Sequence, residues 1–201
     1  MAYSSLSAFV YDCNVCPTRC DGVSKGVYRF ENDVLFSEQY EQMIIRRINR
    51  SGKYVASKSI EPGYPDITVK DLNGEVQKFI EVKVQQRTFM QVVKHLPAGN
   101  LSPSETVALN QSDLLRYFAI ENENNIPTTI VWVLMNRMCV VPVHTQQLYY
   151  QQISALSKIY KQYGDARRFR RKSGEGDLVD GVHKGVTVNY HFSLKELKRW
   201  V

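Results

Sequence analysis

The sequence predicts an α/β fold. Two kinds of hydrophobic pattern lead to this prediction: apolar residues at three- and four-residue intervals, typical of helices, and short alternating or apolar runs, typical of strands. Helices and strands that follow one another in this way pack as a sheet covered by helices. In chain order the segments are a helix at 33–49, strands at 53–60, 63–70 and 76–84, a helix at 109–123 and a strand at 128–134.

The first predicted helix covers residues 33–49. Asn32 or Asp33 can cap its first turn, and Ser51-Gly52 is a typical helix end. Its apolar residues fall on one face, which we expect to be buried. They are Phe36, Tyr40, Met43, Ile44 and Ile48.

Two of the predicted strands form a hairpin. Residues 63–70 are a short strand broken at its start by Gly and Pro, and residues 76–84 are a longer strand. The stretch 71–74 between them reads Asp-Leu-Asn-Gly, and Asn-Gly is a strong hairpin signal. A hairpin lays the two strands side by side and brings Asp66 near Glu81.

The alternation of side chains along the longer strand decides which residues share a face. Successive side chains of a strand point to opposite faces. Glu81 and Lys83 therefore project the same way, about 6.5–7 Å apart along the strand. One face carries Ile80, Val82 and Val84, and the other carries Phe79, Glu81, Lys83 and Gln85.

The second predicted helix, at residues 109–123, is closed by Asn124-Asn125. Pro127 then leads into residues 128–134, a nearly continuous apolar run that is typical of a buried central strand. The apolar residues of the helix are Leu114, Leu115, Phe118 and Ala119.

Length and composition predict one domain. The chain has 201 residues, with 43% hydrophobic and 23% charged residues, which is ordinary for a globular protein with a real core. We expect the core of the fold at 33–143, a cysteine-containing segment at 1–32 and a basic extension at 144–201. Within the extension, residues 186–192 predict a strand and 193–200 a short capped helix that completes the fold.

Asp66, Glu81 and Lys83 form the candidate catalytic site. Mg²⁺ prefers oxygen ligands and keeps several waters, so one or two carboxylates plus a substrate phosphate suffice to hold it. A lysine beside the metal can orient or deprotonate the attacking water, or stabilise the transition state. The alternative is that Asp66 begins a turn and Glu81–Lys83 is a surface ion pair.

The residues Pro65-Asp66 and Glu81-Val82-Lys83 resemble the PD-(D/E)XK signature of restriction-endonuclease-like nucleases. The order helix, three strands, helix, strand over residues 33–143 is also similar to that superfamily. The resemblance implies a restriction-endonuclease-like mixed sheet, Mg²⁺-dependent cleavage of DNA, and Asp66, Glu81 and Lys83 as the core of the site. The superfamily also includes members that have lost activity or that act on tRNA.

The superfamily often adds an acid from its first helix to the metal site. Glu41 borders the buried stripe of the first helix and is the expected extra acid and metal ligand, with Glu38 as the second choice; the alternative is an exposed acid paired with Arg46 or Arg47. Gln85 shares the face of Lys83 and either contacts phosphate or orders a water, or is simply solvated.

The charge of the chain favours a polyanionic partner. The formal net charge is +6, and five cations are concentrated in one short run that a Gly-rich segment follows. Such a run suits contacts to a phosphate backbone, with Phe169 stacking on a base or packing inward. The alternative is a solvated helix end. The expected nucleic-acid-binding residues are Arg167, Arg168, Arg170, Arg171 and Lys172.

The cysteines are a second unusual feature. Cys13, Cys16 and Cys20 form C-x2-C-x3-C, and Cys139 lies far downstream. We favour reduced thiols here and keep Zn²⁺ or an iron–sulfur cluster as the alternative. The four histidines have no tight ligand spacing, so we expect them to be structural or exposed: His95, His144, His183 and His191.

These observations favour a Mg²⁺-dependent DNA endonuclease of restriction or DNA repair and recombination type, in which Mn²⁺ is able to substitute. Two alternatives stay open: a catalytically silent nucleic-acid-binding protein on the same fold, and an iron–sulfur-containing exonuclease-type enzyme. The partner is DNA, and a homodimer is compatible with this interpretation. No run of eighteen apolar residues and no secretory signal is found, so we expect no membrane association and a cytoplasmic protein.

Overall fold

The fold is described from a computed structural model of the chain. It describes the stretches 30–85, 89–134, 146–170, 178–179, 182–183 and 188–200, of which 30–36, 178–179 and 182–183 are described as backbone only.

A six-stranded mixed sheet forms the centre of the molecule. Strands β3 and β5 are parallel, and every other neighbouring pair is antiparallel. This arrangement confirms the predicted α/β fold with a mixed central sheet flanked by helices. The strand order is β1 (Val55–Lys58), β2 (Ile67–Lys70), β3 (Val76–Gln85), β5 (Thr128–Leu134), β6 (Gln147–Gln152) and β11 (Lys198–Trp200).

A smaller three-stranded sheet and several helices complete the described structure. The small sheet has the order β4 (Thr106–Asn110), β10 (Val188–Ser193) and β7 (Arg168–Arg170), and β8 (Leu178–Val179) pairs with β9 (Val182–His183). The helices are α1 (Phe30–Asn49), α2 (Val92–His95), α3 (Gln111–Asn124) and α4 (Ile153–Tyr163), with 3-10 turns η1 (Pro97–Gly99), η2 (Gly164–Arg167) and η3 (Leu194–Glu196).

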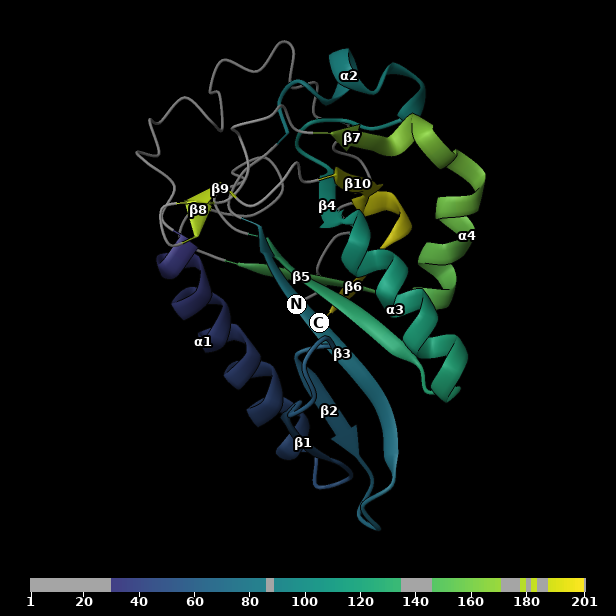
Figure 1. The fold of residues 1–201 in the computed structure, drawn as a ribbon. Helices are drawn as coiled ribbons and strands as arrows, with labels where there is room; N and C mark the ends of the chain where they lie inside the picture. The colour runs from purple at the N-terminus through teal and green to yellow at the C-terminus, as the bar shows by residue number, and fades with distance from the viewer. Residues whose placement is uncertain are drawn as a thin grey trace, which may run out of the picture.

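The helices cover opposite faces of the central sheet. Helix α1 lies along one face, and α3 and α4 lie on the other, with the small sheet beside them (Figure 1). Side-chain alternation along β5 sends Trp132 toward α3 and α4 and sends Val131 and Val133 toward α1. Both faces of β5 are therefore buried, as its continuous apolar sequence predicts.

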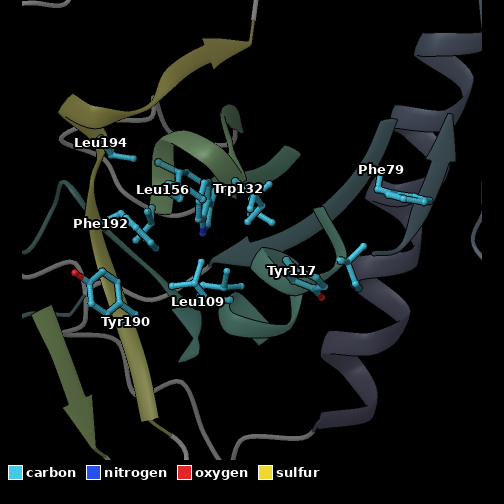
Figure 2. Close-up of a cluster of buried hydrophobic side chains, with 14 residues drawn as sticks. Phe79, Leu109, Tyr117, Trp132, Leu156, Tyr190, Phe192 and Leu194 are labelled. Atoms are coloured by element: carbon cyan, nitrogen blue, oxygen red, sulfur yellow. The ribbon is translucent and has the colours of Figure 1, made fainter. Parts of the chain in front are cut away.

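Two large hydrophobic clusters hold these layers together. On the α1 side, Tyr40 and Ile44 pack against Ile80 and Val82 of β3. On the α3 side, a larger cluster joins both sheets and both helices, extending from the small sheet to Phe79 at its far end (Figure 2). The residues labelled there are Phe79, Leu109, Tyr117, Trp132, Leu156, Tyr190, Phe192 and Leu194.

The predicted hairpin is confirmed. Ile67 pairs with Ile80 in the antiparallel ladder of β2 and β3, and a bulge lies between Val69 and Lys70. In the turn, the Gly74 N–H donates to the carbonyl of Asp71 at 3.1 Å, and Gly74 has a φ of +88°. A glycine is favoured there because residues with a Cβ rarely adopt positive φ.

Strands β1 and β2 are shorter than the predicted 53–60 and 63–70, and further predicted details also differ from the structure. Helix α1 begins at Phe30, three residues before the predicted start. The segment before α3 is strand β4, whose last residue, Asn110, caps the helix by accepting from the Ser112 N–H. Strand β4 pairs with β10, far along the chain, so no local pattern could reveal it. On α3 itself, Leu115 is exposed, and Tyr117 is buried in its place.

The C-terminal part belongs to the fold core. The predicted helix at 193–200 is one 3-10 turn, for which Ser193 and Glu196 form a capping box, followed by strand β11. Pairing of β11 with β6 prevails over the local helical pattern. Because β6 and β11 lie in the central sheet, the core extends beyond the predicted limit at residue 143.

Candidate active site

The site lies where strand β2 separates from β3. Asp66 immediately precedes β2 and stands opposite Glu81 in the ladder that Ile67 and Ile80 begin. The Asp66 N–H donates to Glu81 Oε2 at 3.3 Å, and the Val82 N–H donates to Asp66 Oδ2 at 2.8 Å. The Asp66 carboxylate therefore accepts the hydrogen bond from the Val82 N–H that a longer strand β2 would otherwise accept. Asp66 and Glu81 lie close together, as the predicted hairpin implies.

Glu81 and Lys83 both project from β3 toward α3, as the alternation predicts. Lys83 Nζ lies 2.5 Å from Glu81 Oε1. Glu81 is 3% exposed, whereas the Lys83 side chain keeps 32% of its surface exposed. The pair is therefore not the exposed surface ion pair of the alternative interpretation: the carboxylate is buried, and only the lysine reaches solvent.

Helix α3 adds three side chains to the site. Asp113 Oδ2 lies 3.7 Å from Lys83 Nζ, and Arg116 Nη2 lies 3.0 Å from Asp113 Oδ1. Arg116 also donates to the Tyr117 hydroxyl at 3.3 Å. Sequence reasoning missed these residues because their contact with Lys83 depends on how α3 packs over β3, which no local motif encodes.

The electrostatics of the site reflect two buried carboxylates in close contact. Burial, and then the charge of Glu81, raise the pKa of Asp66 from 3.8 to about 7; the Val82 N–H and Lys83 oppose this shift. Burial alone would lower the pKa of Lys83, but the adjacent Glu81 and Asp113 carboxylates outweigh it, and that pKa is raised. The site therefore has an excess of negative charge that a cation would relieve.

Glu41 reaches the same region from α1. It is 6% exposed, its Oε2 lies 3.1 Å from Lys58 Nζ, and Ser37 Oγ donates to its Oε1 at 3.4 Å. Glu38 also pairs with Lys58, at 3.3 Å. The partner is thus Lys58 rather than the surface arginines of the alternative. Glu41 lies on the α1 side of the sheet, and its charge contributes to raising the pKa of Asp66.

Gln85 joins the two sheets. Its Oε1 accepts from the Ala108 N–H at 3.2 Å, and its Nε2 donates to the Ala108 carbonyl at 3.5 Å. The amide is therefore engaged with the backbone of β4 and is not simply solvated. This position gives Gln85 a structural contact in addition to any role at the site.

The donor set at Asp66 and Glu81 fits a hard divalent cation. Within the described stretches, no group of three or more histidine, cysteine or acidic side chains is close enough to hold a metal ion alone. Two carboxylates completed by waters and a substrate phosphate are nevertheless a usual Mg²⁺ environment. Burial and repulsion by Glu81 raise the pKa of Asp66, and a bound cation would offset both effects.

Arg167 is a correction to the predicted nucleic-acid interface. Its side chain is fully buried: Nε donates to the Gly99 carbonyl at 2.8 Å, and Nη1 pairs with Glu196 Oε2 at 2.6 Å. Its guanidinium also lies over the Tyr163 ring, 3.5 Å from the centroid. A guanidinium held in this way connects η1, η2 and η3 and does not face a phosphate.

Within the described part of the basic run, Arg168–Arg170 form strand β7 rather than a helix end. Arg168 and Arg170 are exposed, and Arg168 pairs with Asp165 at 3.0 Å. Phe169 packs inward, with its ring centroid 5.0 Å from that of Phe89. Arg171 and Lys172 lie outside the described residues.

The described residues include the side chains of two histidines and no cysteine. Cys13, Cys16, Cys20, Cys139 and His144 lie outside the described residues, and His183 is described as backbone only. His191 is buried and contacts the Arg167 carbonyl at 3.2 Å, and His95 is exposed and contacts Gln91 at 2.9 Å.

None of the described helices is long and apolar enough to span a membrane.

Comparisons with known proteins find a similarity among solved structures. No protein-family model and no curated protein sequence matches the chain. Among solved structures it is similar to Hjc, a Holliday junction resolvase from the archaeon Archaeoglobus fulgidus, with 9% identity and a TM-score of 0.41 over 80% of this chain and 85% of that one. A similarity at this level transfers no residue role and no activity.

Proposed function

We propose that this protein is a metal-dependent nuclease that hydrolyses phosphodiester bonds in DNA. The observation that carries the proposal is the meeting of Asp66, Glu81 and Lys83 where β2 leaves β3. Two acids and a lysine at this spacing are suited to hydrolysis because the acids hold a cation and the lysine serves the attacking water.

Each of the three residues has a distinct task in this proposal. Asp66 and Glu81 would hold Mg²⁺, or Mn²⁺ in its place, and the bound ion supplies a water of lowered pKa and stabilises negative charge on phosphorus. Lys83, partly exposed, reaches toward solvent, where it would orient the water or stabilise the transition state. Asp66 with a pKa of about 7 releases its proton readily when a cation arrives near neutral pH.

Two peripheral assignments belong to the same proposal. Glu41 would complete the metal environment from the α1 side, directly or through a water, after exchanging its contact with Lys58. Arg168 and Arg170 on β7 would contact the DNA backbone, together with the basic residues that follow them in the chain.

The test is cleavage of plasmid, linear and branched DNA with Mg²⁺, Mn²⁺ or EDTA. We expect cleavage only with metal, and a loss of about 100-fold or more in Asp66→Asn, Glu81→Gln and Lys83→Met. Each variant should still bind DNA, because the two acid variants lessen repulsion of phosphate and Lys83→Met removes only one cation. Glu123→Gln, an exposed acid on α3, is the control and should cleave as wild type. Full activity in Asp66→Asn would contradict the assignment.

A second candidate is a nucleic-acid-binding protein without cleavage. The observation in its favour is that both Glu81 oxygens are engaged, one by Lys83 and the other by the Asp66 N–H. If these contacts outcompete the cation, DNA would be bound and left intact. The same assay separates the two: DNA binding without cleavage in every metal condition supports this second candidate.

A further inference from the structure

Five polar side chains from β3 and α3 form a ring beside the proposed catalytic site. Glu81 pairs with Lys83 at 2.5 Å, and Lys83 with Asp113 at 3.7 Å. Asp113 pairs with Arg116 at 3.0 Å, and Arg116 donates to the Tyr117 hydroxyl at 3.3 Å. Tyr117 in turn lies beside Glu81: burial, and then the charge of that carboxylate, raise the pKa of the Tyr117 hydroxyl.

The α3 half of this ring is firmly held. Tyr117 is 2% exposed, and its neighbours Leu114 and Ile120 are buried in the same cluster as Phe79 and Trp132. The first turn of the helix, which contains Asp113, is fixed by the Asn110 cap. The helix therefore presents Asp113 to Lys83 from a rigid base.

Lys83 requires such a partner because its side chain is long and its charge is mobile. A lysine has four flexible methylenes, and its ammonium can take up many positions. With Glu81 as its sole anion, the ammonium would stay on the carboxylate that is also needed by the metal. A second anion, Asp113 on α3 at 3.7 Å from the ammonium, draws the lysine toward α3.

We propose that Asp113 is a positioning residue that holds the Lys83 ammonium between α3 and β3, and so leaves Glu81 able to bind the cation. This inference rests on the proposed nuclease function of the same site. Asp113 acts through Lys83 and has no direct contact with the reacting groups. Its own orientation is set by Arg116, whose guanidinium also lies over the Tyr117 ring, 5.1 Å from the centroid.

A purely structural role for Asp113 makes a different prediction. An acid in the first turn of a helix stabilises the helix through its interaction with the helix dipole. Loss of that effect would change stability without touching the rate of a chemical step. A positioning role would change the rate and leave DNA affinity unaltered.

The first arm of the test measures single-turnover cleavage by the full chain. We expect Asp113→Asn to lower the rate at saturating DNA and Mg²⁺ about 10- to 100-fold, with the DNA dissociation constant unchanged. The control is Glu105→Gln, which removes an acid of similar burial outside the site. Glu105 pairs with Lys195, and the two charged groups are 3.3 Å apart. The control variant should cleave as wild type. A wild-type rate in Asp113→Asn overturns the proposal.

The second arm does not depend on cleavage, so failure of this inference can be told from failure of the proposed function. In wild type, NMR of lysine side chains should show the Lys83 ¹⁵Nζ signal as a restrained ammonium with slowly exchanging protons. In Asp113→Asn that signal should broaden or vanish, while it persists in Glu105→Gln. An unaltered Lys83 signal in Asp113→Asn overturns the positioning role, whereas absence of cleavage by wild type overturns only the nuclease assignment.

Discussion

Asp66 combines two tasks that conflict in the absence of metal. Its carboxylate satisfies the Val82 N–H at the edge of β3, which a buried backbone group requires. It also places a negative charge in a buried position beside Glu81. Burial, and then the charge of Glu81, raise the pKa of Asp66 to about 7. A residue chosen for stability alone would keep the hydrogen bond and lack the charge.

This conflict predicts how metal-free stability varies with pH. Because the folded pKa of Asp66 is about 7 and the ordinary value is 3.8, the folded state holds more protons between these values, and stability falls as pH rises through that window. Asp66→Asn keeps an acceptor for Val82 and removes the charge. We expect it to raise the free energy of unfolding at pH 8 by on the order of 2 kcal/mol, with little gain at pH 4.

The measurement is urea unfolding in EDTA at both pH values. Glu123→Gln serves as the control because it removes an exposed acid from α3. Equal effects of Asp66→Asn at pH 4 and pH 8 would show that the charge of Asp66 is not penalised.

Arg167 shows how a cation in a basic run can be entirely structural. Arg167→Ala would leave the Glu196 carboxylate and the Gly99 carbonyl without this donor. We expect a loss of about 3 kcal/mol in the free energy of unfolding. Arg168→Ala, which breaks an exposed pair, should cost less than about 1 kcal/mol. Denaturant unfolding measures both, and similar costs would contradict the buried role of Arg167.

At the scale of elements, the strand geometry of β7 places the apolar residue and the two cations of this segment on opposite faces. Alternation along a strand exposes Arg168 and Arg170 and turns Phe169 into the cluster of Val92, Leu96 and Leu101. A helix would have distributed these residues differently. Strand β7 thus pairs with β10 at the edge of the small sheet and exposes two cations to solvent.

The β7 cations make a testable prediction about DNA affinity. Replacing Arg168 and Arg170 with Gln should weaken binding to all sequences similarly and flatten the slope of log affinity against log salt by about 0.9 per lost contact. Replacing Arg46 and Arg50 of the α1 end with Gln removes the same net charge and serves as the control. An equal change of slope in both double variants would mean that only net charge matters.

At the scale of the whole molecule, a bound cation should stabilise the fold. An ion between Asp66 and Glu81 would connect the two strands of the hairpin, and Glu41 would reach it from α1 through a water. Binding to the folded state alone adds about 2.7 kcal/mol when the metal is at 100 times its dissociation constant. Melting with Mn²⁺ and without it reports this effect.

Glu41→Gln is the variant that tests the contribution of α1. It should lessen the rise of melting temperature with Mn²⁺ and reduce cleavage, while metal-free stability changes little because Lys58 keeps Glu38. Glu38→Gln is the matched variant on the same helix and should retain the metal response. The reverse result would transfer the role to Glu38.

The sequence by itself determined helix α1, the hairpin of β2 and β3, the succession of α3 and β5, and the face that Glu81 and Lys83 share. These features follow from local rules: strand alternation, Asn-Gly turn chemistry and the continuous apolar run of 128–134. The resemblance drawn from Asp66, Glu81 and Lys83 depended on this local information too.

Only the tertiary structure decided which residues surround the site and which cations face solvent. Asp113 and Tyr117 reach Glu81 and Lys83 because α3 crosses β3, a contact between segments separated by a strand and two short helical turns. Arg167 is buried because Glu196, distant in sequence, supplies its counter-charge. Propensity and periodicity depend only on residues that are close in sequence. They therefore do not predict which remote residues pair in the folded protein.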